Sequence, residues 1–199
     1  MKESALRIAR EKAVYEILTK IPHPNILQCI LSVPQGMFLE HMETTLQARI
    51  DNKTLGPVST QTRWISQITS AIAWLEGLGY VHGDLRPANI LLTAKDDIRL
   101  ADFDASVRVG EQLEVASDAF CKIDEDFELP CAGPVSEQFS LGSCIYTIRL
   151  GHIPHHELDA PDRIKKLMNS DFPATAQDAL FGDVTLKVLA GRVHVTPCY

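Results

Sequence analysis

Three polar residues set around two short apolar runs constrain this chain more than any other feature. Asp84 and Asn89 flank a loop, and the apolar run 90–92 follows it at once. Asp102 comes directly after a second apolar run, at residues 98–101. Because the pattern before the loop is helical and both apolar runs have the length of strands, the three side chains are expected at neighbouring loop and strand ends. The sequence therefore predicts one polar edge built from a loop and two strands.

The residue types at this edge indicate phosphate chemistry. Two carboxylates and a carboxamide supply the oxygen ligands that Mg²⁺ prefers. If Asp84 stays off the metal, it can orient or deprotonate a hydroxyl nucleophile. Arg86 adds positive charge for a transferring phosphoryl group. Each residue taken alone is more often a solvated loop residue, so only the set favours a catalytic site.

The rest of the chain predicts helices and one hairpin. Residues 2–21 lack Gly and Pro, and they place several side chains on one helical face (Glu11, Val14, Tyr15 and Leu18). Two apolar runs, 26–33 and 37–39, predict a hairpin turning at Pro34-Gln35-Gly36. Further helices are predicted between residue 60 and Gly77, over residues 136–150 and near residues 178–189, with an irregular acidic stretch over residues 107–135.

Charge and composition exclude several classes of protein. Lys and Arg number 19 against 26 Asp and Glu, which gives a formal charge of −7, and an acidic chain without a basic run is a poor nucleic-acid binder. No apolar run approaches the roughly 18 residues of a membrane-spanning helix, and the charged start of the chain lacks the apolar region of a secretory signal. The five cysteines are odd in number and form no C-x-x-C pair. We therefore expect an intracellular, cytoplasmic protein that binds neither nucleic acid nor membrane.

The polar loop and the strand end after it closely resemble the catalytic core of protein kinases. Residues 82–92 (HGDLRPANILL) are similar to the catalytic loop H-R-D-L-x-x-x-N, and residues 101–104 (ADFD) are similar to D-F-G on the next strand. The separation of 18 residues between Asp84 and Asp102 is also like that of the family. Other matches follow in the family's order. Glu11 resembles the glutamate of helix C, and residues 23–27 (HPNIL) resemble the segment after that helix. Residues 38–42 (FLEHM) resemble the strand entering the hinge, and residues 136–142 (SEQFSLG) resemble the start of helix F.

This resemblance implies an α+β, protein-kinase-like fold with an incomplete N-lobe at residues 1–42 and a mainly helical C-lobe at residues 43–199. The N-lobe would hold helix C and a short hairpin. The implied reaction is ATP- and Mg²⁺-dependent phosphoryl transfer to protein Ser or Thr hydroxyls. The roles that the resemblance implies are catalytic for Asp84, Arg86 and Asn89, Mg²⁺-binding for Asn89 and Asp102, and nucleotide-binding for Glu11, Leu39, Glu40 and Met42.

The chain departs from the family pattern at the elements that bind ATP phosphates and at single positions of the H-R-D and D-F-G motifs. Kinases cradle ATP with a Gly-rich loop and pair a lysine of strand 3 with the helix C glutamate. The ten residues before Glu11 are predicted to be helical, so we expect a truncated or degenerate family member with weak or lost activity. Gly83 replaces the arginine of H-R-D, so control through a phosphate on the activation loop is not expected. Asp104 replaces the glycine of D-F-G; since Asp tolerates left-handed backbone better than most residues, we expect the turn to persist.

Two other functions stay open on the sequence alone. The first is a catalytically inactive pseudokinase that acts as a protein-binding module. An isolated hairpin exposes its edges and is only marginally stable, so the chain is expected either to pair its sheet with a partner or to be unstable alone. The second is a small-molecule phosphotransferase, because residues 82–89 and 102–104 are also similar to aminoglycoside and choline phosphotransferases.

Overall fold

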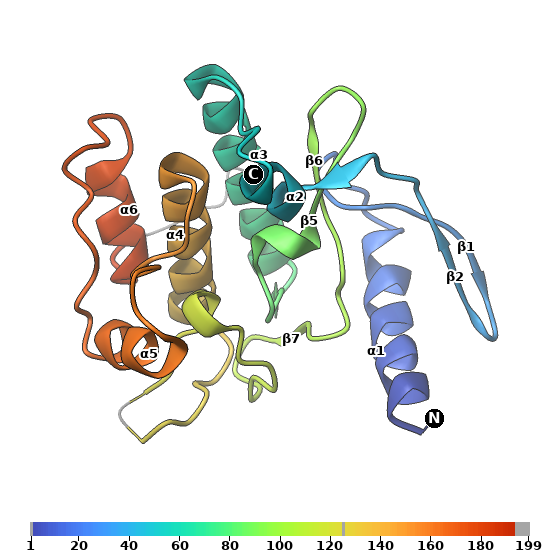
Figure 1. Ribbon diagram of the computed structural model, residues 1–199. Helices are drawn as coiled ribbons and strands as arrows, with labels where there is room; N and C mark the ends of the chain where they lie inside the picture. Colours follow the sequence, from blue (N-terminus) through green and yellow to red (C-terminus); the bar gives the residue numbers. More distant parts are fainter. Residues whose placement is uncertain (1, 125, 194–199) are drawn as a thin grey trace.

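The computed structural model describes residues 2–124 and 126–193, in which helices and short strands alternate (Figure 1). The α-helices are α1 (Lys2–Leu18), α2 (Leu46–Asp51), α3 (Val58–Gly77), α4 (Pro134–Leu150), α5 (Ala160–Met168) and α6 (Gly182–Leu189). The strands are β1 (Cys29–Val33), β2 (Gly36–Leu39), β3 (Thr44–Thr45), β4 (Tyr80–Val81), β5 (Ile90–Leu92), β6 (Ile98–Leu100) and β7 (Val107–Arg108). This composition confirms the predicted α+β class.

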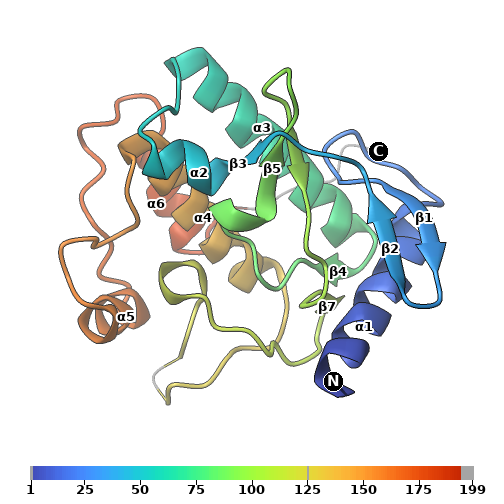
Figure 2. The ribbon, with the colours of Figure 1, turned by 45° about the vertical axis from the view of Figure 1, so that its right-hand side comes forward.

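Helix α1 and the β1–β2 hairpin lie side by side at one end of the molecule (Figures 1 and 2). Val14, Tyr15 and Leu18 are buried on one face of α1, as their helical spacing predicts. The Lys12 ammonium donates to the carbonyl oxygens of Val33 and Pro34, which fastens the tip of the hairpin to the helix. The predicted helix and hairpin are therefore confirmed.

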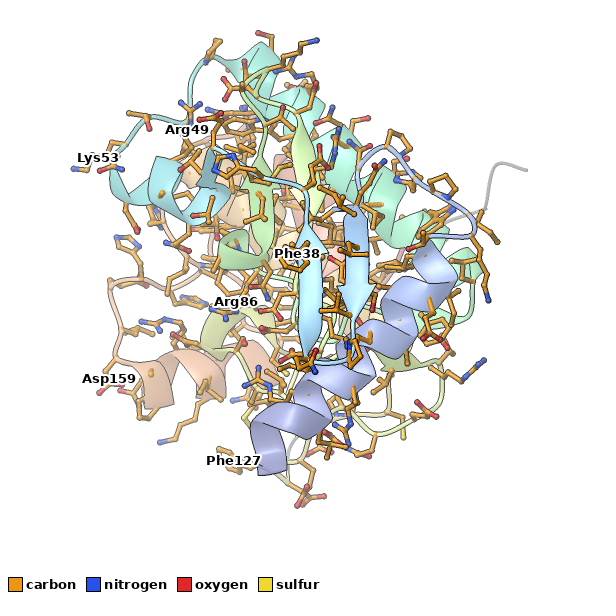
Figure 3. The ribbon with its side chains drawn as sticks, turned by 90° about the vertical axis from the view of Figure 1, so that its right-hand side faces the viewer. Phe38, Arg49, Lys53, Arg86, Phe127 and Asp159 are labelled. Carbon is orange, nitrogen blue, oxygen red and sulfur yellow. The ribbon has the colours of Figure 1, made fainter. Side chains whose placement is uncertain are left out.

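The two faces of the hairpin differ in exposure. Leu31 and Phe38 are register partners, and both are exposed. Figure 3 views the hairpin with α1 beside it and labels Phe38. The partly buried Cys29, Met37 and Leu39 pack against the main core instead. One face of the sheet is thus joined to the core, and the other presents apolar side chains.

The main core joins α3 to the three-stranded antiparallel sheet β3-β5-β6. The α3 side chains Ile65, Ile68 and Leu75 are buried toward this core, in agreement with the predicted helical face. Strands β5 and β6 each bury their first and third side chains, and Asn89 and Asp102 lie beyond the strand ends. This arrangement fixes the position of the site described below.

Helix α4 is buried along most of its length and packs closely against α6. A Cβ atom at Gly142 would lie 2.8 Å from Leu189, so glycine is required at this crossing. The helix begins at Pro134, two residues earlier than predicted, and α6 begins at Gly182 rather than near residue 178. Helices α2 and α5 were not predicted from the sequence.

Candidate active site

The antiparallel pairing of β5 with β6 brings Asn89 next to Asp102. Ile90 pairs with Leu100, so the start of β5 lies beside the end of β6. The Ala101 N–H donates to the Asn89 carbonyl oxygen at 2.9 Å. Asn89 precedes β5 by one residue and Asp102 follows β6 by two, so both project from one edge of the sheet, as the sequence predicts.

Three donors fix the Asp84 carboxylate. The Asn89 side-chain amide donates to Asp84 Oδ2 at 2.9 Å, and Arg86 Nε donates to the same oxygen at 3.0 Å. The Ser117 hydroxyl donates to Oδ1. The Asp84 side chain is only 9% exposed, whereas that of Arg86 is 40% exposed. The predicted catalytic residues Asp84, Arg86 and Asn89 therefore form one hydrogen-bonded group, with Arg86 at its surface.

Asp102 lies in a crowded acidic environment beside this group. Burial raises the pKa of its carboxyl, and the charges of Asp104 and Asp84 raise it further. Its backbone is left-handed, with φ of 64°. The left-handed backbone was expected at Asp104, and this expectation is wrong, because Asp102 and not Asp104 adopts it. Asp104 instead forms an ion pair with Arg7 of α1.

Glu11 of α1 reaches the same acidic group. Its half-buried carboxylate accepts the N–H of Phe103, while burial and the charge of Asp102 raise its pKa. The Arg7 cation opposes this increase. The structure thus places Glu11 beside the Asp102–Asp104 segment, as expected for a helix C glutamate.

Three aromatic rings contact one another in a row beside the site. Phe103 is fully buried and contacts the Tyr15 ring edge-on at 5.4 Å and the His82 ring at 5.2 Å. His82 Nε2 lies 2.9 Å from the Ala101 carbonyl oxygen, and the Asp84 N–H donates to His82 Nδ1 at 3.3 Å. His82 therefore connects the loop with Asp84 to the strand that ends at Asp102.

The remaining predicted nucleotide-binding residues lie at and after the end of β2. Leu39 is its last residue, and the Glu40 N–H donates to the Gln28 carbonyl oxygen at 2.9 Å. The Glu40 carboxylate lies 3.6 Å from Arg99, and Met42 is half-buried. That these residues bind the nucleotide stays a prediction.

Glu137 is a buried positioning residue that the sequence analysis did not single out. Its Oε2 accepts the N–H groups of His82 at 3.1 Å and Gly83 at 3.4 Å, so α4 holds the start of the loop. Among the described residues its Oε1 has no hydrogen-bond partner. Burial raises its pKa from 4.5 to about 7. The available signal was its place in residues 136–142, the segment that resembles the start of helix F.

Glu137→Gln should make the fold more stable than the wild type at neutral pH, where ionising the buried Glu137 carboxyl lowers the free energy of unfolding. A carboxyl whose pKa rises on folding stabilises the fold below its unfolded pKa and loses this contribution as the pH rises through its folded pKa. The change from 4.5 to about 7 corresponds to about 3 kcal/mol. Since Gln keeps an acceptor oxygen for His82 and Gly83 but does not ionise, the variant should gain about 3 kcal/mol over the wild type between pH 4.5 and pH 8.

Urea unfolding of both proteins across this pH range measures the difference. Glu16→Gln, at an exposed position on α1, is the matched control. A gain of the same size in the control, or a pH-independent difference in Glu137→Gln, would contradict the role of Glu137.

The side chains of Asn89 and Asp102, at the ends of β5 and β6, have the chemistry of Mg²⁺ ligands. The Asn89 amide nitrogen donates to the Asp84 backbone and side chain, which leaves the Asn89 side-chain oxygen available as a ligand. The carboxylate of Asp102 supplies a second hard oxygen donor. Within residues 2–124 and 126–193, no three His, Cys, Asp or Glu side chains gather into a metal cage. Two protein ligands, completed by phosphates and water, match the usual coordination of Mg²⁺ in nucleotide sites.

Comparisons with known proteins agree with this geometry. The family model described as the protein kinase domain matches residues 2–180. Serine/threonine-protein kinase MRCK gamma of Mus musculus is 30% identical over 159 residues, which cover 68% of this chain and 10% of that protein. Cytokinesis protein sepH of Aspergillus niger is 26% identical over 171 residues, which cover 82% of this chain and 13% of that protein. Myosin light chain kinase A of Dictyostelium discoideum is 27% identical over 183 residues, which cover 81% of this chain and 59% of that protein.

The chain thus covers less than two thirds of the length of each of these relatives. None of the helices in the described part of the chain is long and apolar enough to cross a membrane. The extent of the family match, together with the joined catalytic loop and Asp102–Asp104 segment, identifies the chain as a member of the protein kinase family.

Proposed function

We propose that this chain carries out phosphoryl transfer from Mg-ATP to a Ser or Thr hydroxyl of a protein. The observation that carries the proposal is the group around Asp84, whose carboxylate is oriented by Asn89 and Arg86 beside Asp102. Solvated loop residues would not share partly buried hydrogen bonds in this way. One of the relatives named above is a serine/threonine-protein kinase, which supports the substrate class.

Each residue of the group has a separate part in this proposal. Asp84 orients the acceptor hydroxyl and accepts its proton. Asn89 and Asp102 hold Mg²⁺, and Arg86 faces the transferring phosphoryl group from the surface side. Mg-ATP, when bound, supplies the phosphoryl group, and its Mg²⁺ supplies the positive charge that offsets the negative charge of the phosphates. Because such catalysis is mostly positioning and electrostatics, the fixed geometry of Asp84 is what the protein contributes.

The nucleotide itself is proposed to lie between the two lobes. Residues 1–42 form the reduced N-lobe in this proposal, and residues 43–199 form the C-lobe. Glu11 borders the phosphates, while Leu39, Glu40 and Met42 border the base. A cavity of about 430 Å³ lies beside the catalytic loop, and Asp84, Arg86 and Asp104 help to line it.

One observation favours a second function, that of a non-catalytic binding module. The Ser117 hydroxyl donates to Asp84 Oδ1, which is an oxygen that an acceptor hydroxyl would use. Asp104 also places a further negative charge against Asp102. In this alternative, the site binds a partner protein without transferring phosphate.

Transfer of labelled γ-phosphate from ATP to casein, with and without EDTA, separates the candidates. The proposal expects Mg²⁺-dependent labelling of casein that EDTA abolishes, because Asn89 and Asp102 act through the metal. Parallel reactions with kanamycin and with choline report on small-molecule acceptors. Labelling of kanamycin or choline alone would contradict a protein acceptor, and no labelling of any acceptor would favour the binding module.

A further inference from the structure

Residues 114–117 lie against the proposed acceptor position, and both ends of this segment contact the residues around it. The Ser117 hydroxyl donates to Asp84 Oδ1. Three residues earlier, the Glu114 carboxylate accepts two hydrogen bonds from the Arg10 guanidinium of α1, and the one from Nη2 to Oε1 is 3.2 Å long. The same four residues thus place a hydroxyl on the proposed base and a carboxylate on a cation.

Side chains, and not the backbone, hold the middle of this segment. Within the part of the chain that the structure describes, the backbone of residues 114–116 makes no hydrogen bond. Leu113 before the segment and Ala119 after it are buried, so the segment is fixed at both ends. Because its middle is held only through the two side-chain contacts, a peptide that offers the same two groups can replace it.

Both contacts are open to an incoming peptide. They border the cavity of about 430 Å³ beside the catalytic loop, which Arg10, Asp84, Glu114 and Ser117 help to line. The side chains of Arg10 and Glu114 are 44% and 55% exposed, and Ser117 is half-buried. A second carboxylate can therefore reach the Arg10 guanidinium from solvent.

The charge of Arg10 selects the side chain that it binds. Its hydrogen bond and its positive charge lower the pKa of Glu114, so the carboxyl is ionised in this pair. A guanidinium binds a carboxylate through two parallel hydrogen bonds, which adds geometric specificity to the attraction. Glutamine at the same place would lose the charge, and lysine would be repelled.

We propose that the acceptor site takes a peptide with an acidic side chain three residues before the Ser or Thr, that Arg10 binds this acidic side chain, and that residues 114–117 occupy the site when no peptide is bound. The inference rests on the proposed function in one respect, the assignment of Asp84 Oδ1 to the acceptor hydroxyl. Residues 114–117 then compete with the substrate, and Glu114 is their acidic anchor.

Three fluorescently labelled peptides test the proposal by anisotropy titration of the full chain, without any nucleotide. The first copies residues 113–119 (LEVASDA), and the other two carry Gln or Lys in place of its glutamate. The wild type should bind the Glu peptide about 2–5-fold more tightly than the Gln peptide, as an exposed ion pair implies, and the Lys peptide most weakly. Glu114→Gln should bind the Glu peptide more tightly than the wild type does, because the competing segment has lost its anchor.

Arg10→Glu reverses the charge of the proposed specificity residue. This variant should bind the Lys peptide most tightly and the Glu peptide most weakly, which a merely structural role of Arg10 would not produce. Lys20→Glu, at another exposed position that also changes from a cation to an anion, is the matched control and should keep the wild-type order. Thermal unfolding verifies that the variants are folded.

Equal affinities of the wild type for the three peptides, or the wild-type order in a folded Arg10→Glu, would overturn the role of Arg10. Absence of saturable binding to any peptide, in the wild type and in Glu114→Gln alike, would overturn the site. Unchanged affinity for the Glu peptide in Glu114→Gln would overturn the competition by residues 114–117. Casein labelling without a peptide preference contradicts this inference alone, whereas a peptide preference without casein labelling contradicts phosphoryl transfer alone.

Discussion

Asp84→Asn is expected to lower the rate of phosphoryl transfer by about 10²–10⁴-fold while leaving Mg-ATP binding in place, since positioned general bases contribute this much. The substitution keeps the shape of the side chain and the acceptor for one of its donors. It removes the negative charge that would take the proton of the acceptor hydroxyl. Initial rates of casein labelling at saturating Mg-ATP measure the effect.

Asp183→Asn is the matched control, because Asp183 is an exposed aspartate on α6, far along the chain from the loop, with its side chain 93% exposed. The control should transfer phosphate at the wild-type rate. Equal rates for Asp84→Asn and the wild type would contradict the role of Asp84, and the group would then be structural.

Gly83→Ala is expected to destabilise the fold by about 4 kcal/mol, through backbone strain and overpacking together. Gly83 has φ of 79°, and a Cβ atom there would lie 2.3 Å from the carbonyl oxygen of Ala105. Restoring the arginine that the family pattern has at this position should be at least as harmful, because the backbone geometry and not the side chain forbids it. Urea unfolding gives the loss in free energy of unfolding.

Two glycines nearby on the chain separate the causes. Gly79 has φ of 78° but would bring its Cβ within 4 Å of nothing, so Gly79→Ala should cost only about 1 kcal/mol of backbone strain. Gly77 ends α3 with ordinary φ and open space, so Gly77→Ala should be neutral or slightly stabilising. Similar losses in all three variants would contradict the steric account of Gly83.

The sequence predicts well the elements whose evidence is local. The helical face of Val14, Tyr15 and Leu18 and the hairpin around Pro34-Gln35-Gly36 follow from spacing and turn residues within a short window. The polar edge was also predictable, because two short strands joined by a tight turn must be antiparallel neighbours. Asn89 before one strand and Asp102 after the other then meet without further information.

The contacts that complete the site depend on residues far apart in the sequence, and local patterns do not report them. Glu137 meets the loop from 55 residues away, and Ser117 reaches Asp84 across 33 residues. The expected left-handed turn at Asp104 was wrong, because the left-handed backbone falls on Asp102. The Asp104 side chain forms an ion pair with Arg7, 97 residues away, which local patterns also do not report. The α5 helix was missed because it is short, at nine residues, and follows a proline-containing loop.

Calorimetric titration of Mg-ATP into the purified chain tests the central claim most directly, because the claim requires Asn89 and Asp102 to hold the metal with the nucleotide. The wild type should bind ATP in the presence of Mg²⁺ and not in EDTA, and Asp102→Asn should lose this Mg²⁺-dependent binding, while Asp183→Asn retains it. No binding by the wild type at millimolar ATP (on the order of −4 kcal/mol), or equal binding by Asp102→Asn, would contradict a working nucleotide site at this edge of the sheet.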